Sequence, residues 1–229
     1  YERYEREQIS RLDGFYGVVE EEFNRRIGEH IAGHSVLDFG CGFGSLVADL
    51  QRRGYEATGI DLLDFQIAEG EKRFPNADLR LVTPDEPLPF PDQAFDTVVF
   101  KESLHHLAAE GDIVGALREV GRVCRQRIVV FEPNPSVPLK IGRTLIAHVD
   151  PTLEPAAASA ILRDAGFSPQ PPVYLSSLAL PLSGGYVGRR LVPARRRRSR
   201  SFASTTGSSA SSVRARLGRT FSSPTTSRG

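Results

Sequence analysis

Residues 36–44 read VLDFGCGFG, and this stretch decides the fold of the chain. An apolar run that ends in three closely spaced glycines predicts a strand over 35–39, a tight turn, and a helix over 45–53. Glycine allows the turn and lets a ligand approach the backbone, because no Cβ stands in the way. The pattern therefore indicates a strand–turn–helix unit that receives a nucleotide-like ligand.

Two acids strengthen this interpretation, since a glycine pattern alone is a weak signal. Asp38 precedes the first glycine by two residues, and Asp61 ends the next expected strand. An acid at the end of that second strand can accept hydrogen bonds from both hydroxyls of a ribose, as in other Rossmann-like sites. The acids therefore favour a ligand that carries a ribose.

Strands and helices alternate after this unit. The apolar pattern predicts strands over 55–60, 79–82, 97–100 and 127–131, and helices over 64–74, 112–124 and 155–165. We expect the first thirty residues to be helical, and 173–175 and 186–192 to pair as a final antiparallel couple. Alternation of this kind implies right-handed βαβ crossovers. The expected fold is α/β, a Rossmann-like three-layer sandwich with a mainly parallel seven-stranded sheet and an antiparallel last strand.

Charge is unevenly distributed along the chain. Eleven of the 29 Lys and Arg residues follow position 188, where there is no acid, so residues 1–188 hold 18 basic against 28 acidic residues. From position 194 the composition is dominated by Arg, Ser, Thr and Gly, which is typical of a segment that cannot bury a core. We therefore expect a domain over 1–193, with a helical N-terminal cap over 1–33, and a disordered basic Arg/Ser-rich tail over 194–229.

The arginine run at 195–198 raises the question of nucleic-acid binding. An arginine run on a disordered tail binds polyanions without selectivity. The acidic body argues against RNA or DNA as a substrate, so we expect no nucleic-acid partner.

Cys41 and Cys124 are the two cysteines, and no CxxC pair or zinc-like Cys/His spacing accompanies them. This usage fits a reducing compartment and predicts no metal site. The charged N-terminus is unlike a signal peptide, and no stretch is apolar enough for a membrane span. We expect a cytoplasmic protein without a membrane span.

Several segments of the chain resemble motifs of a known family. VLDFGCGFG looks like motif I of the class I S-adenosylmethionine-dependent methyltransferases, and TGIDLLDFQIA (58–68) resembles their second motif. LPFPDQAFDTVVFKESLHHL (88–107) is similar to the end of strand four in the methyltransferase type 11 subgroup, which contains the ubiquinone and menaquinone methyltransferases. ILRDAGF (161–167) looks like the helix end before the C-terminal hairpin. The resemblance covers roughly residues 34–193 and implies S-adenosylmethionine (SAM) as cofactor.

The resemblance also implies a set of cofactor-binding residues. They are Asp38, Gly40, Cys41, Gly42, Gly44, Asp61, Leu62, Asp85, Glu86, Lys101 and Glu102. The glycine turn and Asp38 would line the methionine end of the cofactor, Asp61 would hold the ribose, and Leu62 would lie beside the adenine. Pro84 stands where the family usually has an acid that meets the adenine amine, so Asp85 or Glu86 is expected to replace it. Backbone at Lys101 and Glu102 would flank the cofactor.

Three side chains are candidates for chemistry. His105 and His106 follow the expected fourth strand, where ligands bind in such sheets, and one of them could act as a general base near neutral pH. Packing or a hydrogen bond is the alternative role for these histidines. Cys41 is better explained by small size and burial than by nucleophilic catalysis.

Methyl transfer is the function that the resemblance implies. We expect the N-terminal helix, residues 134–150 and the loop before the last strand to form the acceptor pocket. Their apolar residues predict a small-molecule or lipid-like acceptor, and they are Phe15, Leu139, Ile141, Leu145, Ile146, Leu178 and Leu180. A non-catalytic SAM-binding protein is an alternative, because it would keep the same cofactor motif. An NAD-dependent oxidoreductase is a second alternative. The GxGxG spacing and the lack of a Tyr-x-x-x-Lys pair count against it.

Overall fold

The computed structural model describes residues 15–84, 86–110, 113–135, 151–176 and 208–217. Five parallel strands form the centre of one sheet, in the order β3-β2-β1-β4-β5. They are β1 (Ser35–Phe39), β2 (Glu56–Asp61), β3 (Asp78–Leu81), β4 (Phe95–Lys101) and β5 (Cys124–Pro133). The strand order reverses between β1 and β4, which is the point where ligands bind in open α/β sheets.

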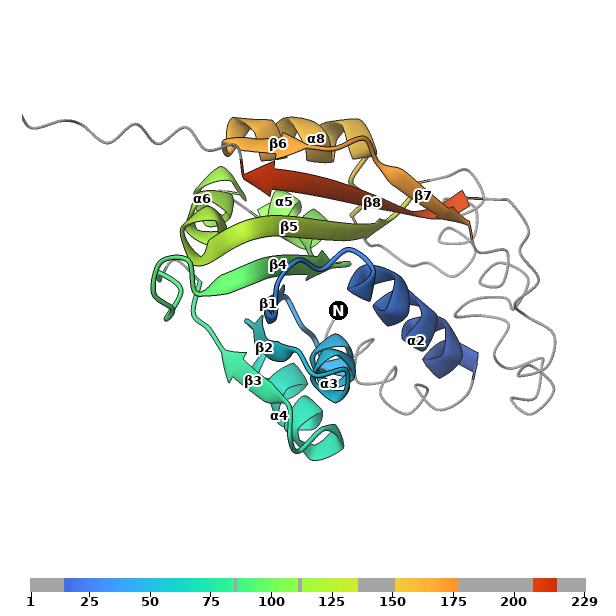
Figure 1. Cartoon of the computed structure of the whole chain (residues 1–229), viewed down its shortest axis with the longest axis vertical. Coiled ribbons are helices and arrows are strands. Elements are labelled where there is room, and N and C mark those ends of the chain that lie inside the picture. Colours follow the sequence, from blue (N-terminus) through green and yellow to red (C-terminus); the bar gives the residue numbers. More distant parts are fainter. Residues whose placement is uncertain (1–14, 85, 111–112, 136–150, 177–207, 218–229) are drawn as a thin grey trace, which may run out of the picture.

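Beyond β5 the sheet continues with an antiparallel strand, β8 (Ser208–Leu217). Figure 1 shows the arrow of β8 pointing opposite to that of β4. Two short strands, β6 (Phe167–Pro169) and β7 (Val173–Ser176), each pair with β8. The described residues thus form an eight-stranded sheet where seven strands were predicted. The predicted strand at 173–175 is β7, and it pairs antiparallel with β8, whereas the predicted 186–192 strand lies outside the described residues.

The strand β8 falls inside the segment 194–229, which we expected to be a disordered tail. Seven of its ten residues pair through their backbone with β5. Backbone groups make the ladder hydrogen bonds of a sheet, so a strand that covers an open edge does not need a continuous apolar sequence. The sequence of β8 also alternates Val213, Ala215 and Leu217 with two arginines, a period-two pattern that the overall composition hides.

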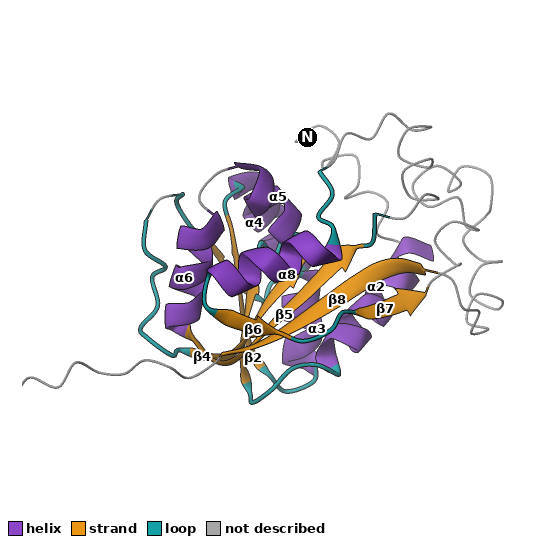
Figure 2. Ribbon diagram, turned by 90° about the horizontal axis from the view of Figure 1, so that it is seen from above, coloured by secondary structure: helices purple, strands orange, loops and turns teal. Residues whose placement is uncertain are grey.

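Helices cover both faces of the sheet, as Figure 2 shows for α8 and α6 on one face and α3 on the other. On one face, α2 (Phe15–Gly28), α3 (Ser45–Arg52) and α4 (Asp64–Arg73) contribute to an apolar cluster that includes Ile27, Leu46, Val47, Leu50 and Ile67. On the other, α5 (Leu104–Glu110), α6 (Ile113–Val123) and α8 (Pro155–Asp164) contribute to a second cluster that includes Leu104, Leu117, Val120 and Leu162. The α/β Rossmann-like sandwich that we predicted is confirmed.

The strands buried on both faces are the most apolar ones, because each must pack against two helix layers. Val98, Val99 and Phe100 of β4 are fully buried, as are Ile128, Val129 and Val130 of β5. In this way the sheet holds the carboxyl ends of β1, β2, β4 and β5 in a rigid frame. Among the described residues, no helix is both long and apolar enough to cross a membrane.

Candidate functional site

The glycine turn after β1 approaches its neighbours too closely for a side chain at Gly40 or at Gly44. Gly40 and Gly44 both have φ of 76°, in the left-handed region that favours glycine. A Cβ on Gly40 would lie 2.6 Å from Cβ of Ser103, and one on Gly44 would lie 2.6 Å from Cδ2 of Leu79. The turn is thereby held closely between Leu79 of β3 and Ser103, which follows β4.

Asp61, at the end of β2, forms a hydrogen bond with this turn. Its Oδ2 accepts a hydrogen bond from the backbone N–H of Gly42 at 2.9 Å, and its Oδ1 accepts one from that of Leu63 at 2.9 Å. Burial raises the pKa of the Asp61 carboxyl, whereas these backbone N–H donors lower it. Leu62, the next residue, is 46% exposed.

Asp38, on β1, is almost fully buried at 1% exposure. Its Oδ1 has no hydrogen-bond partner within the described ranges of the chain. Burial raises the pKa of its carboxyl to about 7, and the nearby charges of Asp61 and Glu20 add to the rise, whereas Lys101 opposes it. A buried polar atom without a partner is costly, so such an atom at a sheet edge is a candidate ligand contact.

Lys101 ends β4 and ties α2 to the glycine turn. Its Nζ donates to Glu20, to Oδ1 of Asn24 at 2.8 Å and to Oγ of Ser45 at 3.4 Å. Ser45 also donates to Glu20 at 2.6 Å. Ion pairing with Lys101 lowers the pKa of Glu20 against the opposing effect of burial. Sequence reasoning placed Lys101 at this edge but missed Glu20 and Asn24, whose only signal was their position on the predicted N-terminal helix.

Glu102, the residue after β4, adopts φ of 54°, which is rare for a residue with a side chain. Its backbone N–H donates to the carbonyl of Phe131 at 2.7 Å and so holds this conformation. Burial, followed by the charge of Glu20, raises the pKa of the Glu102 carboxyl to about 7. Unusual backbone of this kind gathers at ligand-binding edges.

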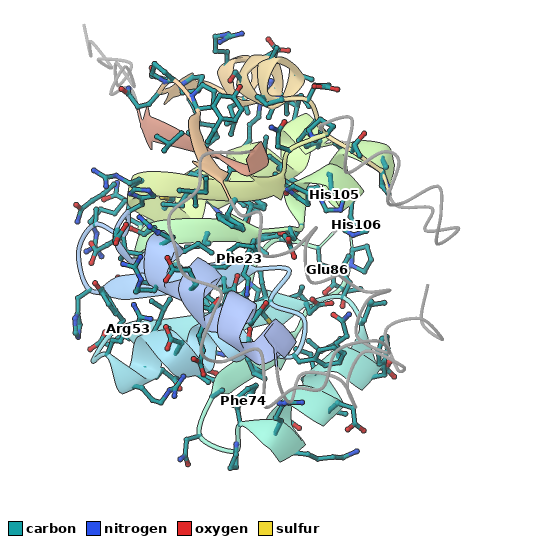
Figure 3. The ribbon with its side chains drawn as sticks, turned by 90° about the vertical axis from the view of Figure 1, so that its right-hand side faces the viewer. Phe23, Arg53, Phe74, Glu86, His105 and His106 are labelled. Atoms are coloured by element: carbon teal, nitrogen blue, oxygen red, sulfur yellow. The ribbon has the colours of Figure 1, made fainter. Side chains whose placement is uncertain are left out.

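The two candidate histidines lie at the start of α5. Nδ1 of His105 is 2.5 Å from Oε2 of Glu132, and both side chains are buried. The other oxygen of Glu132 accepts from the backbone N–H of Leu104 at 2.7 Å. Figure 3 shows His105 and His106 next to each other, and their ring centroids are 4.1 Å apart. Sequence reasoning missed Glu132, although an acid directly after a buried strand was a signal that could have found it.

The remaining predicted residues are spread more widely. Cys41 is buried, and burial together with the charges of Asp38 and Asp61 raises the pKa of its thiol, which fits packing and not nucleophilic chemistry. Glu86 is exposed in the loop before β4. Asp85, the other candidate for the adenine amine, lies outside the described residues. Within the part of the chain that the structure describes, no group of three or more His, Cys, Asp or Glu side chains could hold a metal ion.

The structure thus brings Asp38, the glycine turn, Asp61, Lys101 and Glu102 to one edge of the sheet. This is the edge where the strand order reverses, between β1 and β4. Figure 3 views the molecule from this side.

Known proteins resemble this chain in sequence. The model of a methyltransferase domain family matches residues 37–130, which run from β1 into β5. A probable S-adenosylmethionine-dependent methyltransferase of Mycolicibacterium smegmatis is 30% identical over 152 residues, or 62% of this chain and 55% of that protein. The chain therefore spans about half the length of this relative.

Solved structures share the fold. A SAM-dependent methyltransferase from Archaeoglobus fulgidus has a TM-score of 0.65 at 18% identity, over 86% of this chain and 93% of that one. Magnesium protoporphyrin IX methyltransferase from Synechocystis, solved with bound SAH, has a TM-score of 0.58 at 16% identity, over 88% of this chain and 84% of that one. The family match, the sequence relative and the shared fold thus agree in making this chain similar to the class I S-adenosylmethionine-dependent methyltransferases.

Proposed function

We propose that this chain transfers a methyl group from SAM to a small-molecule or lipid-like acceptor by in-line displacement. The observation that carries the proposal is the glycine turn bracketed by two buried carboxyl groups, Asp38 and Asp61. The turn provides backbone that a ligand can approach, and the acids provide partners for a cation and for hydroxyl groups. The family match over residues 37–130 supports the same activity.

The charge of the edge favours SAM over a dinucleotide. SAM carries a sulfonium and an ammonium group, whereas NAD would bring a pyrophosphate with two negative charges to the same turn. Asp38, Asp61 and Glu20 surround that turn, and the Lys101 ammonium already pairs with Glu20. Buried acids attract a cation and repel a pyrophosphate. The NAD-dependent alternative is therefore disfavoured by electrostatics as well as by the glycine spacing.

The residues present fit the cofactor on two observations. The buried Oδ1 of Asp38 has no partner in the described part of the chain, and it would gain one from the ammonium of the methionine end. The turn at Gly42, where an added Cβ would meet only Oε1 of Gln66 at 3.6 Å, leaves room beside the backbone. Asp61 would accept from the ribose, and the exposed Leu62 would pack on the adenine. Glu86 would meet the adenine amine, a role that it shares with Asp85 as a candidate.

The cofactor supplies a methyl group that is already activated, so the protein has little covalent chemistry to perform. Its residues must hold the acceptor atom in line with the methyl group and exclude water, which can be worth roughly 7–11 kcal/mol. The Lys101–Glu20 pair fixes α2 against the turn and thereby closes one side of the site. Of the acceptor lining expected at 134–150, residues 136–150 lie outside the described residues, so the acceptor class rests on the apolar sequence there.

A general base would be needed for an acceptor whose reacting atom carries a proton. His106 is the better placed of the two candidates, because it is only partly buried whereas His105 is 3% exposed. Glu132 and His105 would then position His106 by hydrogen bonding and ring contact.

Calorimetric titration of the full chain with SAM, S-adenosylhomocysteine (SAH) and NAD tests the cofactor. The full chain is required because β8 lies at Ser208–Leu217. We expect both sulfur ligands to bind and NAD to give no heat. Asp61→Ala should abolish binding, whereas Asp64→Ala, an exposed acid three residues away, should leave it unchanged. Binding of NAD, or silence from both sulfur ligands, would overturn the proposal.

A further inference from the structure

The loop that joins β3 to β4 is fixed at both of its ends. It begins beside the proposed ribose site, where the backbone N–H of Val82 donates to the carbonyl of Asp61 at 3.0 Å. Leu88, farther along the loop, is buried in the core. Residues 83–87, here called the arch, lie between these two anchors and include the acids that are expected to meet the adenine amine. The side chain of Glu86, one of these acids, is exposed (Figure 3).

The guanidinium of Arg122, on α6, binds the backbone at the far end of the arch. Its Nη2 donates to the carbonyl of Leu88 at 3.0 Å, and its Nη1 donates to that of Phe90 at 2.8 Å. Glu119, one turn earlier on α6, accepts the backbone N–H of Leu88 at 2.9 Å and a hydrogen bond from Nε of Arg122 at 3.0 Å. Both polar backbone groups of Leu88, the residue that follows the arch, are therefore held by α6.

An arginine suits this arrangement better than a lysine would. Its planar fork has five N–H donors in fixed directions, so one side chain can bind two carbonyls of the loop and the Glu119 carboxylate together. A lysine ammonium is a point charge on a flexible stem, and it cannot reach all of these acceptors at once. The position of Leu88 therefore depends on the shape of the Arg122 side chain as well as on its charge.

Prolines make the arch stiff. Pro84 and Pro87 lie within it, and Pro89 follows Leu88. Each proline ring fixes φ at about −65°, so the backbone has few torsions that could absorb a displacement of its anchor. A shift of the backbone at Leu88 should therefore move the side chain of Glu86.

We propose that Arg122 is a positioning residue that sets the specificity of the cofactor site for the adenine amine, through the backbone of Leu88 and the arch. The inference rests on the proposed function, because the acids of the arch need a ligand that carries an adenine. The hydrogen bonds of the Arg122 side chain go to residues 88–92 and to Glu119. Arg122 therefore acts on the ligand through the loop and is not a catalytic residue.

Paired titrations of the full chain measure this specificity. Calorimetry compares the affinity for SAH with that for its 6-deamino analogue, in which a hydrogen atom replaces the adenine amine. A carboxylate that accepts from the amine should favour SAH by about tenfold, as expected for one hydrogen bond to a charged group. In Arg122→Gln we expect this ratio of affinities to fall to about threefold or less, because a hydrogen bond weakens steeply once its partners are misaligned.

Arg122→Lys and a matched control separate positioning from stability. The ring of Phe90 keeps its contacts with the ring of Phe95, at 4.9 Å, and with the Arg80 guanidinium, at 5.3 Å, so the core beneath the loop should persist in both variants. A loss of stability alone lowers the affinity for both ligands by the same factor and leaves their ratio unchanged. Arg122→Lys should lose the ratio as Arg122→Gln does, and it carries the comparison if Arg122→Gln does not fold. Arg118→Gln, which changes an exposed arginine of the same helix, should keep the ratio.

A double-mutant cycle tests whether Arg122 acts through the arch. In a chain with Asp85→Asn and Glu86→Gln the ratio should already be low, and the addition of Arg122→Gln should lower it no further. A further fall in that chain, or an unchanged ratio in Arg122→Gln and Arg122→Lys, would overturn the inference. Equal affinity of the wild type for the two ligands would overturn it as well. Should the wild type bind neither SAM nor SAH, the proposed function itself fails.

Discussion

Oδ2 of Asp61 accepts a hydrogen bond from the backbone N–H of Gly42 at 2.9 Å, which joins the end of β2 to the turn after β1. The same carboxylate accepts from Leu63 with its other oxygen. One acid therefore shapes the two loops between which we propose that the cofactor lies. Hydrogen bonds to a charged group contribute about 1.5–3 kcal/mol each, so Asp61 supports the turn as well as a ligand.

Two replacements of Asp61 should therefore separate the effect of its negative charge from that of its hydrogen bonds to the backbone. Asp61→Asn keeps one carbonyl oxygen for a backbone N–H, whereas Asp61→Ala keeps none. We expect SAH affinity to fall in both variants, and thermal stability to fall further in Asp61→Ala. Calorimetry and thermal unfolding of the two proteins check this. Equal melting temperatures of the two variants would contradict the bracing role of the carboxylate.

Gly40→Ala should be more destabilising than Gly54→Ala. Both glycines have positive φ, 76° and 90°, so both variants incur the left-handed penalty of roughly 1–2 kcal/mol. A Cβ on Gly40 would in addition meet Cβ of Ser103 at 2.6 Å, whereas one on Gly54 would meet no atom within 4 Å. Denaturant unfolding measures the difference, and similar losses in the two variants would mean that the turn is not held as closely as described.

Asp38→Asn should stabilise the ligand-free protein at pH 8 and leave its stability nearly unchanged at pH 4. The folded state raises the pKa of this carboxyl from 3.8 to about 7, so the folded state binds the proton more tightly than the unfolded chain does. The free energy of unfolding of the wild type therefore falls as the pH rises from about 4 to about 7, by about 4 kcal/mol at most. Thermal unfolding of variant and wild type at both pH values checks the sign. A variant that is less stable at pH 8 would contradict it.

Asp96 should behave in the opposite way at the other edge of the sheet. Its carboxylate accepts from the backbone N–H of His34 and of Ser35 and from the side chains of Arg125 and Gln126. The backbone N–H of His34 is the largest influence, and these donors hold the pKa of Asp96 well below its usual range. The ionised Asp96 carboxylate therefore stabilises the folded state at neutral pH, and this stabilisation is lost as the pH falls through the lowered pKa.

Asp96→Asn should accordingly destabilise the protein at pH 7, and the difference from wild type should shrink in strong acid. Thermal unfolding between pH 7 and 2 measures it. Because Asp38→Asn and Asp96→Asn are the same chemical change in one protein, each serves as the control of the other. Changes of stability of the same sign in both variants at neutral pH would contradict the contrast between the two acids. Oδ1 of Asp38 accepts no hydrogen bond from the described residues, whereas Asp96 accepts several.

The parallel half of the fold could be predicted because local pattern and tertiary role agree there. The strand predicted at 35–39 is β1 as observed, and that predicted at 127–131 lies inside β5 (Cys124–Pro133). Two short elements could not be predicted in this way. α5 is seven residues long and contains two histidines, and β6 has three residues and a proline. Neither is long enough to show the hydrophobic periodicity of a helix or a strand.

The strand order beyond β5 could not be predicted from the sequence either. Pairing of β5 with β8 joins residues that are some eighty positions apart, and composition alone predicted no structure there. The site residues likewise fall into those that the sequence predicts and those that only the structure reveals. Asp38, Asp61 and the glycines follow from a motif, whereas Glu20 and Glu132 matter through contacts with Lys101 and His105 that only the folded chain brings about. The cofactor-binding roles assigned to these residues stay predictions.

Transfer of label from SAM carrying a ¹⁴C-methyl group tests the central claim most directly. The full chain is incubated with labelled SAM and a small-molecule and lipid extract, beside Asp61→Ala and Asp64→Ala, and the label is followed by chromatography together with SAH formation. We predict that label passes to a low-molecular-weight or lipid product in equal amount to SAH, with wild type and Asp64→Ala but not with Asp61→Ala. A chain that binds SAM and transfers no label to any extract would be a non-catalytic SAM-binding protein, and the proposed methyl transfer would be wrong.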